Sequence, residues 1–194
     1  MGVPQRTLPD HETHVTLGRV AWLLLTYRLP ADRSSARVTV WREVRRTGAL
    51  QLQQSVVALP DTEEFRRLLA RLRAVVAEVG GSAVALEAQP LEPDDDMRLT
   101  STWNEARAAE YGELATESEK LVSEIDKEFA KEKFTLAELD EEEAELEKLR
   151  SWHERIRARD VLGGDNAAEA EAALDRAAEA VSRYTAAVFD RTHG

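Results

Sequence analysis

The N-terminal fold is decided by VAWLLLTYRLP at residues 20–30, SSARVTVWREVRRTGA at 34–49 and LQLQQSVVALP at 50–60. Trp22–Leu25 is a continuous apolar run of strand length, which is typical of a strand buried on both faces. Pro30 ends this strand because proline has no N–H to donate to the ladder. The sequence therefore predicts a strand, a helix and a second extended segment, in that order.

The segment after the first strand has the pattern of an amphipathic helix. A serine pair at 34–35 supplies an N-cap, and Gly48 supplies a C-cap. Val38, Trp41 and Val44 recur at i, i+3 and i+6, so they form the stripe that we expect to face the core. We assign Trp41 to this core rather than to a surface on which a ligand stacks.

Residues 50–59 alternate between apolar and polar side chains, which predicts either one bent strand or a short hairpin. Asp61 and Glu64 resemble a capping box and start a second helix. Its apolar residues follow the i, i+3, i+4, i+7 pattern up to the glycine pair at 80–81, and a last strand covers 83–86. Right-handed crossovers place both helices on one face of a small antiparallel sheet, which is a ferredoxin-like β-α-β(β)-α-β arrangement.

The C-terminal half reads as helices, because glycine and proline are nearly absent between residues 101 and 162. Phe134–Thr135 marks one joint, with Thr135 as N-cap, and Gly163–Gly164 marks a second joint. The last helix repeats apolar residues at spacings typical of a coiled-coil seam: Ala170, Leu174, Ala177, Val181, Tyr184 and Val188. Three such helices predict an antiparallel bundle or a long helical hairpin.

The fold class is therefore α+β, with a ferredoxin-like domain followed by an acidic helical domain. We place a flexible lead-in at 1–18, the ferredoxin-like domain at 19–92 and the helical domain at 101–190. Two prolines and three consecutive aspartates mark the stretch before the helical domain, which predicts a linker at 93–100.

The charge of the 194-residue chain is unevenly distributed. The net charge is −11, and residues 1–100 hold 13 basic and 13 acidic residues, whereas 101–194 hold 13 basic and 24 acidic residues. This imbalance disfavours nucleic-acid binding by the C-terminal half, because phosphate binding depends on cationic surface. The absence of cysteine, of a long apolar run and of a secretory signal predicts a cytoplasmic protein without a membrane segment.

Motifs for catalysis or cofactor binding are missing from the sequence. There is no G-x-S-x-G elbow, no phosphate-binding glycine loop and no cysteine, which predicts a non-enzymatic protein without a cofactor. His11 and His14 form an H-x-x-H pair that we interpret as a surface pair rather than a metal site. The acidic run from Glu138 fits a solvated helix face near a helix N-terminus better than a metal site.

An arginine group lies within nineteen residues: Arg28, Arg33, Arg37, Arg42, Arg45 and Arg46. Guanidinium groups form bidentate contacts with phosphate and with other tetrahedral oxyanions, so this group is a candidate site for DNA or an oxyanion. The alternative is a solvated face on which Arg37 or Arg42 pairs with a carboxylate such as Glu43. A metal-dependent nuclease is disfavoured, because Arg28 stands after the first strand, where it repels a divalent cation.

This order of motifs resembles the N-terminal domain of ChrB, the bacterial chromate-resistance regulator, and more distantly the ferredoxin-like domain of PaaX-type regulators. Besides residues 20–60, the resemblance rests on KFTLAEL at 133–139, LRSWHERIRARDVLGG at 149–164 and AEAEAALDRAAEAV at 168–181. It covers roughly residues 20–189.

The resemblance implies a non-catalytic part in chromate-responsive transcription regulation or sensing, with DNA bound by the N-terminal domain and chromate as a candidate ligand. Full ChrB proteins carry a second, C-terminal domain that this sequence lacks, so the chain is either a stand-alone half that works beside a separate partner or a part of a longer protein. The alternative is a dimerisation module that pairs through its sheet edges or its alanine seam. Arginines on one exposed face would favour the regulator, and arginines scattered or buried in salt bridges would favour the dimerisation module.

Overall fold

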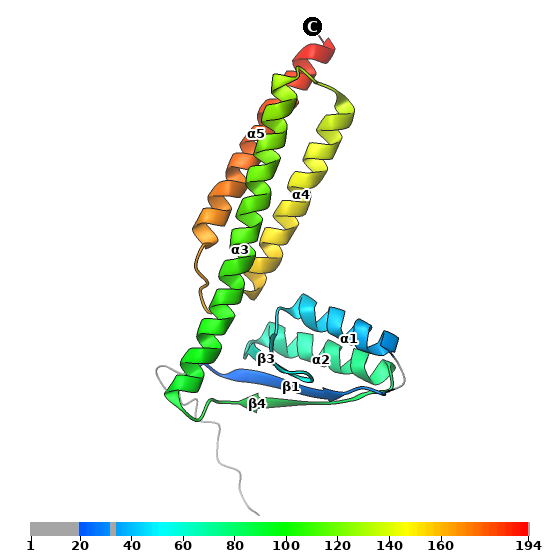
Figure 1. Cartoon of the computed structure of the whole chain (residues 1–194), viewed down its shortest axis with the longest axis vertical. Helices are drawn as coiled ribbons and strands as arrows, with labels where there is room; N and C mark the ends of the chain where they lie inside the picture. Colours follow the sequence, from blue (N-terminus) through cyan, green and yellow to red (C-terminus); the bar gives the residue numbers. More distant parts are fainter. Residues whose placement is uncertain (1–19, 32–33, 194) are drawn as a thin grey trace, which may run out of the picture.

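The computed structural model describes residues 20–31 and 34–193, so the predicted lead-in at 1–18 lies outside the described residues. The strands are β1 (Trp22–Arg28), β2 (Leu50–Gln53), β3 (Val56–Pro60) and β4 (Ser82–Ala88). The helices are α1 (Ser34–Thr47), α2 (Glu63–Glu78), α3 (Pro93–Ala130), α4 (Leu136–Arg159) and α5 (Ala167–His193). A sheet domain and a long helical bundle result (Figure 1).

The four strands form one antiparallel sheet in the order β2-β3-β1-β4. Both α1 and α2 cover the same face of this sheet (Figure 1). This arrangement confirms the predicted ferredoxin-like fold. Of the two readings of residues 50–59, the hairpin is correct: β2 pairs with β3, and the register shifts between Gln51 and Gln53.

Of the stripe that the sequence predicted to face the core, helix α1 buries only Val44. Its buried side chains are spaced by four, four and three residues: Ala36, Val40, Val44 and Thr47. Val38 and Trp41 are instead 46% and 48% exposed. Both stripes fit the helical period, and the stripe with smaller side chains packs inward because it lets the helix approach the sheet closely. The assignment of Trp41 to the core was therefore wrong.

Helix α2 has the predicted apolar face, but its cap is one residue later than predicted. The Thr62 hydroxyl accepts a hydrogen bond from the Phe65 amide at 3.1 Å. Asp61 instead accepts two hydrogen bonds from the Arg66 guanidinium, and its own amide donates to the Ala21 carbonyl at 2.8 Å. The aspartate thus ties the helix start to the residue that precedes β1 and does not serve as the N-cap.

The predicted linker at 93–100 is helical and forms the first two turns of α3. Pro93 occupies the first turn, where its missing N–H costs nothing, and the acidic residues that follow stabilise the positive end of the helix dipole. Asp96 is buried, and its carboxylate accepts a hydrogen bond from the Val20 amide at 3.3 Å. Residues that resembled a linker are therefore helix-start residues.

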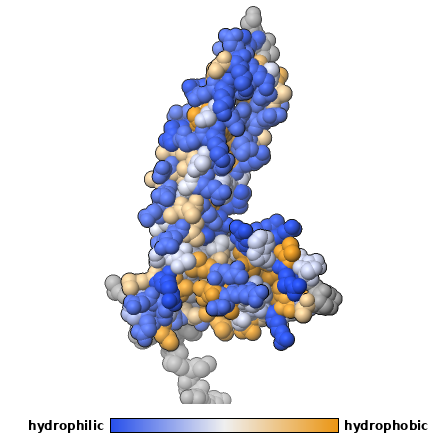
Figure 2. All heavy atoms as spheres, viewed as in Figure 1, coloured by the Kyte–Doolittle hydropathy of each residue, from blue (hydrophilic) through white to orange (hydrophobic). Residues whose placement is uncertain are grey.

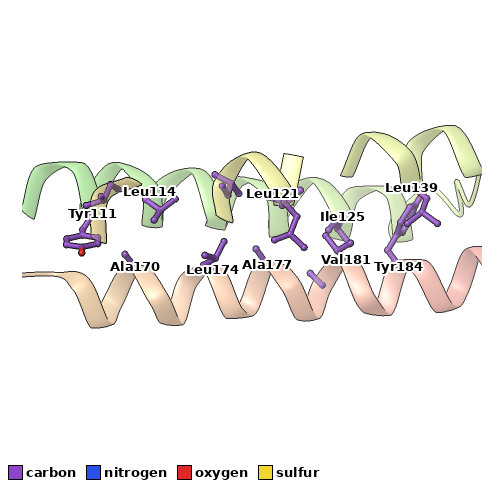
Figure 3. Close-up of a cluster of buried hydrophobic side chains, with 14 of the residues drawn as sticks. Tyr111, Leu114, Leu121, Ile125, Leu139, Ala170, Leu174, Ala177, Val181 and Tyr184 are labelled. Atoms are coloured by element: carbon purple, nitrogen blue, oxygen red, sulfur yellow. The ribbon is translucent and has the colours of Figure 1, made fainter. Parts of the chain in front are cut away.

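Helices α3, α4 and α5 run up, down and up again in a three-helix bundle (Figure 1). Thr135 caps α4 as predicted, since its hydroxyl accepts from the Glu138 amide at 3.3 Å. The joint before α5 contains Gly163 in the left-handed region, at φ 80°. All six predicted seam residues of α5 are buried, and the alanines face α3 closely (Figure 3). None of the described helices is long and apolar enough to cross a bilayer.

Glu142 of α4 makes the bundle sensitive to pH. It is 8% exposed, and burial together with the carboxylates of Glu124, Glu138 and Glu128 raises its pKa to about 7. Between the ordinary carboxyl pKa and about 7, the folded chain keeps a proton that the unfolded chain releases. The contribution of Glu142 to stability therefore falls as the pH rises through this window and is constant above it.

We expect Glu142→Gln to stabilise the protein more at about pH 8 than at about pH 5, because glutamine stays neutral at both values. Urea denaturation of both proteins at the two pH values measures the difference. Glu143→Gln, an exposed neighbour on the same helix, is the matched control and should show little change with pH. An equal effect of Glu142→Gln at both pH values would contradict the raised pKa.

Candidate anion-binding site

An open pocket of about 580 Å³ lies between α1, the end of β1 and the turn between β2 and β3. Three of the six predicted arginines line it: Arg28 at the end of β1, and Arg37 and Arg42 on α1. None of the described residues that line this pocket carries a carboxylate. The structure thus brings together residues from two elements that are separated by a turn in the sequence.

The three pocket arginines have no carboxylate partner among the described residues. Within the described part of the chain none of them forms an ion pair with a carboxylate, and Arg37 donates one hydrogen bond to the Ala31 carbonyl at 3.1 Å. An anion bound between three guanidinium groups is attracted by all of them. The arrangement is chemically suited to phosphate or another oxyanion.

The other predicted arginines lie outside the pocket. The Arg45 guanidinium lies 5.1 Å from the centroid of the Trp41 ring, which is a cation–π contact. Arg46 pairs with Glu43 at 2.7 Å, so the local carboxylate is bound to Arg46 rather than to the pocket. Arg33 lies outside the described residues.

Sequence reasoning missed the aromatic and amide parts of the pocket. Trp41 and Tyr27 line it together with the side chains of Gln51 and Gln54. The Tyr27 hydroxyl donates to the Gln54 carbonyl at 3.5 Å, and burial raises the pKa of Tyr27. The one signal in the sequence is position, because Tyr27 lies near the end of β1 and Gln54 lies in the turn between β2 and β3.

A polar network that the sequence did not predict joins α1 to the bundle. Arg107 of α3 donates to the carbonyl of Gly48 at 3.3 Å, and Arg159 of α4 donates to the carbonyl of Arg46 at 3.2 Å. Glu110 accepts from both arginines, at 3.3 and 2.8 Å. The carbonyls at the end of α1 are thus satisfied by the bundle, which positions the helix that carries Arg37 and Arg42.

Metal ligands do not gather in the part of the chain that the structure describes: it holds no group of three or more His, Asp or Glu residues placed to bind an ion. His11 and His14 of the H-x-x-H pair lie outside the described residues.

Comparison with known proteins gives a curated relative and a family. Protein ChrB of Cupriavidus metallidurans is 28% identical over 155 residues, which cover 78% of this chain and 43% of the relative. The chain therefore spans less than half the length of that relative. No solved structure matches the fold of the chain significantly.

The family described as Protein ChrB, N-terminal, matches residues 37–194 and so begins within α1. Since this match covers most of the chain, the protein belongs to the ChrB N-terminal family.

Proposed function

We propose that the chain is a DNA-binding module of chromate-responsive regulation, and that its phosphate contacts come from the pocket arginines. The observation that carries this proposal is the convergence of Arg28, Arg37 and Arg42 on one open face whose described lining holds no carboxylate. Membership of the ChrB N-terminal family supports the role in chromate resistance. Chromate, as a tetrahedral oxyanion, is a second candidate ligand for the same guanidinium groups.

The distribution of charge favours the sheet domain as the surface that meets DNA. Helix α1 carries four arginines and one glutamate, whereas the acidic bundle projects away from the sheet domain (Figure 1). A duplex that approaches α1 therefore meets local positive charge despite the net charge of −11. The part of a ChrB protein that this chain does not span would complete the regulator, on the same chain or on a separate partner.

A second candidate function, a dimerisation module, is favoured by the exposed apolar side chains of the sheet. Leu52, Val84 and Leu86 are exposed, and apolar residues gather on the sheet domain while the bundle surface is mostly hydrophilic (Figure 2). The alanine seam cannot serve for pairing in this conformation, because Ala170 and Ala177 are already buried against other helices of the same chain.

We expect a labelled duplex from the upstream region of the gene to bind saturably, and to bind more weakly as salt is raised. Replacing Arg28, Arg37 and Arg42 by alanine should weaken binding and flatten the slope of log affinity against log salt by about 0.9 for each phosphate that an arginine no longer neutralises. Fluorescence anisotropy at several salt concentrations measures both quantities. Release of the duplex by chromate would add chromate sensing to DNA binding.

The matched control removes the same charge from the other helix of the sheet domain, by replacing the exposed Arg67, Arg71 and Arg73 of α2 by alanine. This control should bind nearly as well as the unmodified chain. Equal losses of duplex affinity in the two triple variants would show that binding depends on the net charge of the domain and not on the pocket. Absence of binding at micromolar protein would rule out autonomous DNA recognition and favour the dimerisation module.

A further inference from the structure

The pocket at the end of β1 is larger than one oxyanion requires. Its volume of about 580 Å³ falls within the range of about 300–1,000 Å³ that is typical of sites for small organic molecules. One phosphate or chromate ion held by Arg28, Arg37 and Arg42 would leave much of this space unfilled. The rest of the lining includes the rings of Tyr27 and Trp41, so the ligand that fits has both an anionic group and a flat apolar part.

Trp41 has the features of a surface on which a ring can stack. Its side chain is 48% exposed although the indole is large and apolar, and it lines the pocket. The Arg45 guanidinium packs over the ring at 5.1 Å, which restricts the orientation of the indole. Half-exposed aromatic side chains beside a cationic groove are the elements with which proteins bind unpaired nucleic-acid bases.

Two glutamines in the pocket lining offer groups by which flat anions differ. Gln51 and Gln54 line the pocket, and the side-chain amide nitrogen of Gln51 donates a hydrogen bond to the main-chain carbonyl of Gln54 at 3.3 Å. A side-chain amide offers donors and an acceptor, which match the edge of a heterocyclic base. A simple aromatic acid has no such edge, and its single negative charge matches three guanidinium groups less well than a phosphate does.

We propose that this pocket holds one nucleoside phosphate, with its base against Trp41 and its phosphate between Arg28, Arg37 and Arg42. This inference rests on the proposed function because it uses the same arginines to hold a phosphate. It adds that the base attached to this phosphate is unpaired. A base inside a duplex is stacked on its neighbours and cannot reach a side chain in a pocket without leaving the stack. The nucleotide is therefore either free in solution or part of an unpaired strand.

The test compares four probes on the full chain: AMP, a labelled single-stranded oligonucleotide, the duplex of the same sequence, and inorganic phosphate. Calorimetry follows AMP and phosphate, and anisotropy follows the nucleic acids. We expect AMP or the single strand to bind, and inorganic phosphate to bind at least about tenfold more weakly. Binding of AMP indicates a free nucleotide, whereas binding of the single strand without AMP indicates an unpaired nucleotide within a strand.

Trp41→Leu should weaken the binding of AMP or the single strand by about tenfold or more, because leucine offers no ring face. Trp41→Phe should retain most of the affinity. Phe189→Leu is the matched control and should bind normally, since Phe189 is a similarly exposed aromatic residue on α5, outside the pocket lining, and α5 belongs to the bundle that projects away from the sheet domain (Figure 1). Circular dichroism verifies that each variant is folded.

Two outcomes would overturn the inference. One is a Trp41→Leu variant that binds AMP and the single strand as well as the unmodified chain does. The other is binding of the duplex together with failure of both AMP and the single strand, in which case the proposed function stands and this inference fails. Binding of a nucleotide probe without binding of the duplex would instead retain the nucleotide site and remove the proposed duplex recognition.

Discussion

Replacing Trp103 with alanine should lower the free energy of unfolding by about 3–5 kcal/mol, the range found for large aromatic side chains in a core. Trp103 is fully buried where α3 crosses the sheet domain. Its ring makes edge-to-face contacts with Trp22, at 6.3 Å between centroids, and with Phe65, at 5.6 Å. Alanine removes both ring contacts and leaves a cavity that rigid strands cannot close.

Urea denaturation followed by circular dichroism measures this loss without relying on tryptophan fluorescence. Trp103→Phe is the matched control, because it keeps an aromatic ring and removes an indole N–H that has no partner among the described residues. We expect this control to cost at most about 1.5 kcal/mol. Hydrogen exchange should accelerate more in β1 and α2 than in α5, since Trp103 packs with the sheet core. A loss below about 1 kcal/mol for Trp103→Ala would show that α3 is not anchored there.

Replacing Arg107 with alanine should lower the free energy of unfolding by about 3 kcal/mol, at the low end of the range for breaking a buried ion pair. Arg107 is 2% exposed, burial lowers its pKa, and its guanidinium lies 4.7 Å from the ring centroid of Trp103. Alanine leaves the Gly48 carbonyl without its donor and removes the charge that faces Glu110. The loss stays moderate because Arg159 still pairs with this carboxylate.

Arg98→Ala is the matched control for Arg107→Ala, since it removes the same residue type from the same helix. Arg98 also pairs with a carboxylate three residues away, Asp95 at 2.8 Å, but its side chain is 76% exposed. Exposed pairs of this kind contribute about 0–1 kcal/mol, so the control should change stability little. Similar losses for the two variants would show that the junction between α1 and the bundle contributes nothing beyond an ordinary surface pair.

Room for Arg107 is provided by glycines that are distant in the sequence. A Cβ atom on Gly48 would lie 2.6 Å from a guanidinium nitrogen of Arg107, and a Cβ on Gly164 would lie 2.9 Å from the Arg107 Cβ. The sequence indicated Gly48 as a helix C-cap, which its φ of 69° fits, and Gly164 as part of the joint between two helices, where it lies. Their second role, making space for a buried cation, depends on a contact that no local pattern encodes.

The sequence by itself determined the features that depend on neighbouring residues. The apolar run of β1, the apolar face of α2, the Thr135 cap and the alanine seam of α5 all follow from periodicity and capping, and the structure confirms them. The α+β class followed from the order of these elements. The motif order also indicated the ChrB family, which the family match confirms.

Only the tertiary structure decided which face of α1 is buried, that α3 starts at Pro93, and which arginines converge. Val44 belongs to two stripes on α1 that both fit a helix, and packing against the sheet buried the one with the smaller side chains, which left Trp41 at the pocket. The contacts of Gly48 with Arg107 and of Arg46 with Arg159 span 59 and 113 residues. Local propensity carries no information about such pairs, because the separated residues meet only after the strands and helices have packed.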